Sequence, residues 1–126
     1  MADALYDGFK ADLLNKVISM TGDVLKAIAV DDALYTFNAA HTVIADIPVG
    51  ARVATSEPIT GATVSASGNF NSDNPLMLSV SGAEFEAVVL WDETTDSLIG
   101  WYDIAPQTPT GNNITVNVDP SGWFDL

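Results

Sequence analysis

No lysine or arginine occurs after Arg52 in this sequence of 126 residues. Residues 53–126 carry ten acidic side chains, whereas the four basic residues and the other seven acids lie in residues 1–52, for a net charge of −13. A surface without cations cannot neutralise phosphate groups, so we expect neither nucleic acid nor an anionic membrane as a partner. Such a surface also lacks the cation that often stabilises an oxyanion in an active site.

Cysteine is absent and histidine occurs once, as His41. The chain therefore has no disulfide framework, thiolate metal site or cysteine nucleophile. The absence of cysteine is compatible with folding in a reducing cytoplasm. No Gly-x-Ser-x-Gly elbow accompanies His41, which argues against a serine hydrolase triad. Gly50 and Gly61 are not part of a phosphate-binding loop, because no Gly-Lys-Ser/Thr follows either of them. We expect no enzymatic activity and no cofactor.

Long hydrophobic runs are also missing, although 48% of the residues are hydrophobic. No stretch approaches the roughly 20 apolar residues of a membrane-spanning helix. The chain begins Met-Ala-Asp-Ala, without the cationic and apolar regions of a signal peptide. We therefore expect a soluble single domain that is made inside the cell.

The N-terminal segment has the strongest helical pattern. Apolar residues recur every four positions and widen into a broad stripe, made by Leu5, Phe9, Leu13 and Val17 with Tyr6, Leu14 and Ile18. Gly22 is a plausible stop after this stripe. The pattern predicts a helix over about residues 4–19, within an N-terminal unit (residues 1–22) that packs on the domain or on a partner.

Residues 23–126 are predicted to form a β domain. Short apolar or alternating segments separated by turn residues lie at 24–30, 51–55, 62–66, 76–80, 84–91, 98–104 and 114–118. Residues 119–122 read Asp-Pro-Ser-Gly, a type I turn signature, and residues 38–46 are expected to hold a helical turn. The predicted fold is mainly β: a single antiparallel β-sandwich or barrel-like domain with an N-terminal α-helix.

Several acidic and aromatic groups leave other functions open. Glu84 and Glu86 lie on one face of a predicted strand, as a pair of glycosidase carboxylates would, but an outward-facing acidic pair explains them equally well. A Ca²⁺ site at residues 92–96 or at Asp31 and Asp32 is a further alternative, although the spacing is not that of an EF-hand. A glycan-binding module would use three tryptophans for stacking: Trp91, Trp101 and Trp123.

Both ends of the chain carry more large apolar groups than a single contact normally covers. Chain ends usually fray, so the tail must either pair back into the sheet or pack on another subunit. The candidate partner or oligomer interface therefore contains Leu5, Phe9 and Leu13 from the N-terminal segment and Trp123, Phe124 and Leu126 from the tail.

Seven segments follow one another in a characteristic order: residues 5–7, 23–33, 47–56, 59–64, 68–73, 87–90 and 113–116, of which the most specific part is Gly-Ala-Arg-Val-Ala-Thr-Ser at residues 50–56. This order resembles that of small virion proteins of tailed bacteriophages. The chain departs from this pattern at residues 92–97, which are shorter and more acidic, and at residues 119–126. The chain is most similar to capsid decoration, or cement, proteins.

This resemblance implies a structural protein on the capsid surface of a virion. Such a protein binds the outside of the expanded head and stabilises contacts between subunits of the major capsid protein. It implies a homo-oligomer, with a trimer favoured and a dimer possible, and no catalytic residues. Arg52 is the candidate for an inter-subunit carboxylate pair, because arginine makes bidentate contacts. A tail or head–tail junction component is the alternative, and residues 1–52 are the expected partner-facing side.

Overall fold

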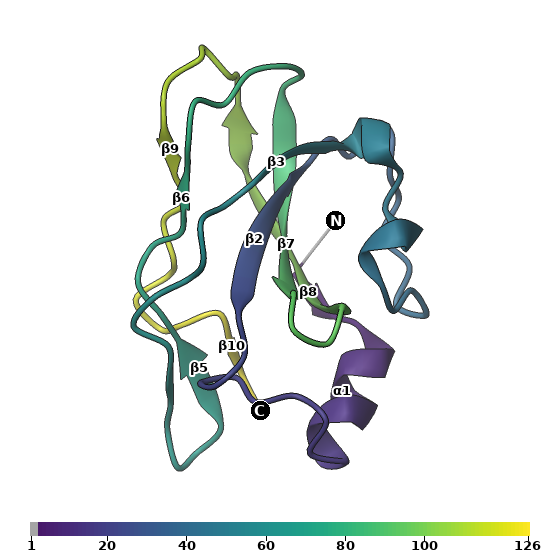
Figure 1. Ribbon diagram of the computed structural model, residues 1–126, viewed down its shortest axis with the longest axis vertical. Helices are drawn as coiled ribbons and strands as arrows, with labels where there is room; N and C mark the ends of the chain where they lie inside the picture. The colour runs from purple at the N-terminus through teal and green to yellow at the C-terminus, as the bar shows by residue number, and fades with distance from the viewer. Residues whose placement is uncertain (1–2) are drawn as a thin grey trace.

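The computed structural model describes residues 3–126 and shows a mainly β, sandwich-like domain with one N-terminal α-helix and antiparallel sheets (Figure 1), which confirms the predicted fold class. Its largest sheet has five strands in the order β1-β8-β7-β2-β3. These strands are β1 (Ala4–Leu5), β8 (Ser97–Gln107), β7 (Phe85–Asp92), β2 (Leu25–Val30) and β3 (Arg52–Thr55). All its neighbouring strands are antiparallel.

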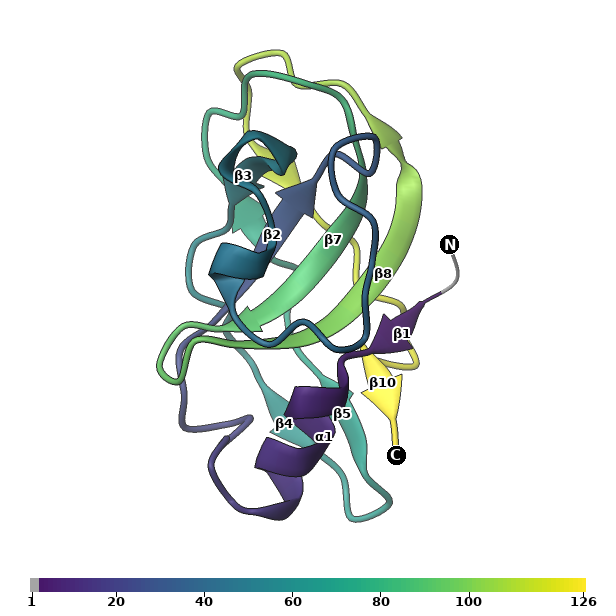
Figure 2. The ribbon, with the colours of Figure 1, turned by 90° about the vertical axis from the view of Figure 1, so that its right-hand side faces the viewer.

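Two small sheets lie on one side of this central sheet. One has the order β10-β5-β4, and the other pairs β6 with β9. Their bounds are Phe124–Asp125 for β10, Asn69–Asn71 for β5, Thr63–Val64 for β4, Leu76–Met77 for β6 and Ile114–Thr115 for β9. The connection from β2 to β3 covers the other side and contains two short 3₁₀ helices, Ile44–Asp46 and Val49–Ala51 (Figures 1 and 2).

Helix α1 spans Asp7–Leu14 and is shorter than the predicted helix at residues 4–19. On its N-terminal side, β1 pairs with β8, and Tyr6 N donates to Ile99 O at 3.0 Å. On its C-terminal side, Lys16 adopts a φ of 59° that a helix cannot continue through. The residues of the apolar stripe are therefore divided among three elements. Leu5 belongs to strand β1, Phe9 and Leu13 belong to α1, and Ile18 is buried in the loop that follows the helix.

The core is built on the three central strands. Residues 27–30 in β2 and 87–90 in β7 are all 0% exposed, because both faces of the sheet are covered. On the face toward the β2–β3 connection, Trp101 lies near Tyr35, with ring centroids 5.8 Å apart. On the opposite face, Tyr102 makes an edge contact with Trp123 at 5.0 Å. Consecutive side chains of β8 point to opposite faces of the sheet, so Trp101 and Tyr102 pack into two different apolar layers.

The predicted strands of the central sheet match β2, β3, β7 and β8 closely, whereas β4, β6 and β9 are shorter than expected. Strands β1 and β5 were not predicted. The turn at residues 119–122 is confirmed by a 2.7 Å hydrogen bond from Gly122 N to Asp119 O. Residues 44–46 form the helical turn expected within 38–46. In the described chain, no helix is long and apolar enough to cross a membrane.

Candidate functional site

An apolar hollow lies between α1 and the C-terminal residue. It has a volume of about 260 Å³ and is lined by Phe9, Lys10, Leu13, Leu14 and Leu126. We name these five residues the helix–tail surface. Leu14 is 84% exposed and Leu126 is 62% exposed. Two large apolar side chains at the rim of an apolar hollow are typical of a surface that binds another protein.

The C-terminal tail is held in place by the small sheet β10-β5-β4. Phe124 pairs with Phe70 across β10 and β5, and Leu126 N donates to Gly68 O at 3.0 Å. Gly68 has a φ of +90°, and a Cβ there would lie 3.1 Å from the Cβ of Leu126. Glycine therefore permits both the turn and the close approach of the tail.

The structure places the predicted interface residues at different depths. Phe9 and Trp123 are 1% and 9% exposed and belong to the core. The others are half-buried or exposed: Leu5, Leu13, Arg52 and Phe124 are half-buried, and Leu126 is exposed. Phe9, Leu13 and Leu126 come together at the helix–tail surface, with Phe124 beneath them. Leu14, which completes this surface, was noted only as part of the apolar stripe.

Arg52 lies away from the helix–tail surface. It is in β3, the edge strand opposite to β1 in the five-stranded sheet. Its Nε donates to the Ile47 carbonyl at 3.0 Å, which fixes the end of the β2–β3 connection. The carboxylate partner predicted for Arg52 in a neighbouring subunit stays a prediction.

Only one of the basic residues described below lines the helix–tail surface. Lys10 lines it and makes an exposed ion pair with Asp7 at 3.5 Å, a contact that contributes little to stability. Lys16 lies two residues beyond the end of α1 and is exposed, but it is not among the residues that line the hollow. By contrast, Lys26 in β2 lies 2.6 Å from Glu93. The lining of the helix–tail surface is therefore apolar except for Lys10.

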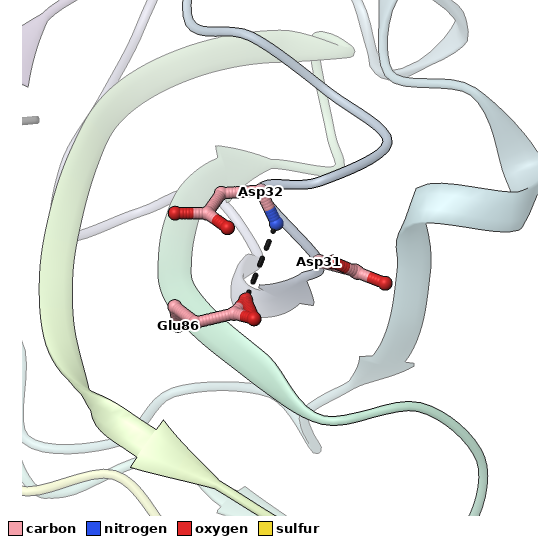
Figure 3. A group of neighbouring side chains, drawn as sticks. All are labelled: Asp31, Asp32 and Glu86. Atoms are coloured by element: carbon pink, nitrogen blue, oxygen red, sulfur yellow. Dashed lines mark hydrogen bonds between the residues drawn. The ribbon is translucent and has the colours of Figure 1, made fainter.

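Figure 3 shows an acidic cluster at the end of β2, made by Asp31, Asp32 and Glu86. One carboxylate oxygen from each lies within 4.8 Å of the others. Asp32 N donates to Glu86 Oε2 at 3.3 Å. The pKa of Glu86 is raised above its ordinary value, mainly because the carboxyl group is desolvated. The nearby negative charges of Asp32 and Asp31 raise it further. Carboxylates so arranged are suitable ligands for a hard divalent cation such as Ca²⁺.

A buried carboxyl group, that of Asp92, lies beside the half-buried Asp23. Asp92, at the end of β7, is 0% exposed, and its Oδ1 accepts a hydrogen bond from Thr95 N at 3.1 Å. Its Oδ2 receives no hydrogen bond from residues 3–126. Burial first, and then the adjacent Asp23 carboxyl, raise the pKa of Asp92 to about 7. In the acidic segment at residues 92–97, the first and last residues, Asp92 and Ser97, are buried.

His41 takes part in a chain of hydrogen bonds. Its Nδ1 lies 2.8 Å from Tyr35 Oη, which in turn lies 3.0 Å from Tyr6 Oη. Burial raises the pKa of both tyrosines, so their hydroxyl groups remain protonated. This chain attaches the β2–β3 connection to the segment before α1, as a structural role for His41 requires.

The three tryptophans have polar partners for their Nε1 groups. Trp101 is 2% exposed and donates to Asp103, and Trp123 donates to Ser72 Oγ at 2.8 Å. Trp91 is half-buried and donates to Asp96 at 3.0 Å. Only Trp91 therefore has a substantial face toward solvent. Glu84, the other residue of the predicted carboxylate pair, accepts a hydrogen bond from Thr108 Oγ1 at 3.1 Å.

Comparison of the sequence with models of protein families finds no match, and comparison with curated proteins finds none either.

Proposed function

We propose that this chain is a structural virion protein that binds the outside of a phage capsid and stabilises contacts between subunits of the major capsid protein. The observation that carries this proposal is the helix–tail surface, where Leu14 and Leu126 are 84% and 62% exposed beside an apolar hollow. Together with the resemblance of residues 50–56 and the other segments to capsid decoration proteins, this surface supports docking rather than catalysis.

The chemistry of the helix–tail surface specifies its partner. Fully burying a leucine side chain contributes about 1.5–3 kcal/mol, so two leucines supply a useful share of a protein–protein contact. Lys10 lines the hollow, and Lys16 is exposed two residues beyond α1, so a partner that docks here would favourably present carboxylates on the opposite surface. The occupant is therefore an apolar side chain of the capsid subunit, flanked by acidic residues.

The polar groups considered for catalysis take part in hydrogen bonds within the fold. His41 is bonded to Tyr35, Glu84 to Thr108 and Glu86 to the main chain of Asp32. These contacts support a structural role for each of them.

Repetition on the head would strengthen the docking. A trimer at a local threefold axis, or a dimer at a twofold axis, presents several copies of the helix–tail surface to the capsid at once. The protein is made in the host cytoplasm and resides on the capsid surface. A position in the tail or at the head–tail junction is the alternative.

The proposal is tested by cosedimentation of the purified protein with expanded heads. The heads come from a phage that encodes this chain and are prepared so that they lack the protein. We expect saturable binding of the unchanged protein and at least a tenfold weaker binding of Leu14→Glu, since each 1.4 kcal/mol is about tenfold in affinity. The matched control is Leu34→Glu, because Leu34 is also an exposed leucine (56%) but lies in the β2–β3 connection.

Absence of binding to heads contradicts the proposal. Equal loss in both variants assigns the effect to charge alone and contradicts the helix–tail surface as the docking site. Immunogold labelling of complete particles distinguishes the alternative location, since labelling of the tail instead of the head would replace the capsid assignment.

A further inference from the structure

A groove separates the end of β8 from β9. Two adjoining hollows, of about 350 and 270 Å³, lie between these strands. Both are lined by Ile104 of β8 and by Val116 and Asn117, which follow β9, so they form one continuous depression. We name it the β8–β9 groove, and it is separate from the helix–tail surface.

One wall of the groove is an edge of β8 that lacks a complete neighbouring strand. Strand β1 pairs with β8 only at Trp101 and Gly100. Asp103 N instead donates to a side-chain oxygen, Asp3 Oδ1, at 2.8 Å. Further along, the Ala105 carbonyl lies 3.5 Å from the side-chain nitrogen of Gln107. Within residues 3–126, no strand pairs with residues 104–107 on this edge.

The other wall of the groove is also a strand edge, formed by β9. Strand β9 pairs with β6 along one edge, through Thr115 with Leu76 and Ile114 with Met77. The opposite side of β9 faces the groove, where Ile114 and Thr115 line the smaller hollow. A groove between two strand edges offers main-chain groups to an extended peptide, as in recognition by strand addition.

The floor of the groove contains both apolar and polar side chains, and its border is acidic. Val116, Tyr102 and Trp123 are buried to 7%, 9% and 9% exposure and line the larger hollow. Asp3 and Asp119 line the same hollow, and no lysine or arginine is among the lining residues. An acidic border around a floor with buried apolar side chains attracts a ligand with both basic and apolar side chains.

We propose that the β8–β9 groove binds an extended segment of a partner protein in which basic and apolar side chains alternate, and that this segment adds as a strand to β8 at residues 104–107. Successive side chains of a strand point to opposite faces. The apolar side chains then reach Ile104 and Val116, while the basic ones lie near Asp119 and Asp3. A second copy of this chain is a poor occupant, because no segment of its sequence alternates basic and apolar side chains. The inference does not depend on binding to heads.

The probe is the synthetic peptide acetyl-Lys-Val-Lys-Val-Lys-Val-Lys-amide, titrated into the full chain by calorimetry. We expect saturable binding with a dissociation constant below about 1 mM that weakens with added salt. Hydrogen exchange should become slower in residues 104–107. A peptide with Glu in place of Lys, and one with alternate amides N-methylated, should both bind at least tenfold more weakly, because they lack the charge or the ladder donors.

A matched pair of variants locates the site. Asn117→Lys introduces a cation into the groove, whereas Asn112→Lys makes the same change at an exposed position outside the groove lining. We expect about tenfold weaker peptide binding for the first and less than twofold change for the second.

Three outcomes would overturn the inference: no saturable binding, equal binding of the Glu peptide or the N-methylated peptide, or equal affinity in the two variants. Association of the chain with itself through this edge, seen as a dimer that the peptide does not dissociate, would also overturn it. If Asn117→Lys does not fold, the peptide series with the unchanged protein decides the question.

Discussion

Phe9 and Phe124 pack edge to face, with ring centroids 5.5 Å apart. The first residue belongs to the N-terminal helix and the second to the last strand, so the two ends of the chain meet. Phe70 extends the cluster by stacking on Phe124, also at 5.5 Å. This contact places the exposed residues Leu14 and Leu126 around one hollow. The predicted interface thus has an internal half, which holds the ends together, and an external half available to a partner.

Removal of the Phe9 ring should destabilise the fold strongly. Phe9 is 1% exposed, and replacing a buried phenylalanine by alanine costs about 3–5 kcal/mol. Phe124→Ala should cost less, because Phe124 is half-buried. Free energies of unfolding from urea titrations should give a coupling of about 0.5–1.5 kcal/mol between the two positions. Leu14→Ala is the control and should stay within about 0.5 kcal/mol of the unchanged protein; strictly additive losses for the two phenylalanines would contradict the ring contact.

Asp92 should make the protein less stable as the pH rises. Its folded pKa is raised to about 7, so between the ordinary aspartate pKa and about 7 the folded state binds more protons than the unfolded state. The stabilisation is complete below the unfolded pKa and is lost as the pH passes through the folded pKa. Asp92→Asn should therefore raise the free energy of unfolding at pH 8 relative to the unchanged protein, and change it less at pH 4.

Asp119→Asn provides the control of opposite sign. Hydrogen bonds from the Ser121 hydroxyl and then from its main chain lower the pKa of Asp119, so this carboxylate stabilises the fold above its unfolded pKa. Asp119→Asn should reduce stability at neutral pH, and the difference should vanish as the pH falls through the folded pKa. Parallel pH profiles for the two variants would contradict the assigned environments.

Added salt should stabilise the isolated protein. Residues 53–126 carry ten carboxyl groups and no lysine or arginine, and salt weakens repulsion between exposed charges. The melting temperature should rise between about 10 mM and about 200 mM NaCl, over which the screening length falls severalfold. A flat profile would mean that the acids are well separated or already bound to cations.

Calcium distinguishes general screening from a bound ion. CaCl₂ and NaCl at equal ionic strength should raise the melting temperature equally if the cluster of Asp31, Asp32 and Glu86 acts only through its charge. A larger rise with CaCl₂ that disappears in Glu86→Gln would identify a cation site there. Glu57→Gln, an exposed carboxylate outside the cluster, is the matched control.

The central strands could be predicted from the sequence because their residues leave few alternatives. Residues 84–91 and 98–104 are apolar over a strand length and are separated by a short polar loop. The N-terminal stripe was harder to interpret. A four-residue repeat predicts one helix, yet Leu5 pairs in β1 and Ile18 packs in the core beyond the helix. Tertiary contacts override the local pattern at both ends of α1.

Groups that depend on distant neighbours could not be predicted. Asp92 is an ordinary loop aspartate by composition, and only the return of β2 alongside β7 buries it next to Asp23. Strand β1 has two residues, too few for any periodicity. For the tail, the sequence left two outcomes open, and the pairing of β10 with β5 realises the one in which the tail joins a sheet of its own chain.

Self-association should be visible in solution. If the protein is a trimer, light scattering should give a mass three times the 13.3 kDa of one chain, and twice that mass if it is a dimer. A monomer at all accessible concentrations would contradict the oligomer in isolation. Binding to heads would then have to assemble the copies.

A reconstruction of decorated heads at side-chain resolution tests the central claim most directly. The account predicts that Leu13, Leu14 and Leu126 are buried against the major capsid protein, with carboxylates near Lys10 and Lys16. A particle in which this chain is absent from the head, or in which the helix–tail surface faces solvent while residues 53–119 make the contacts, would contradict it.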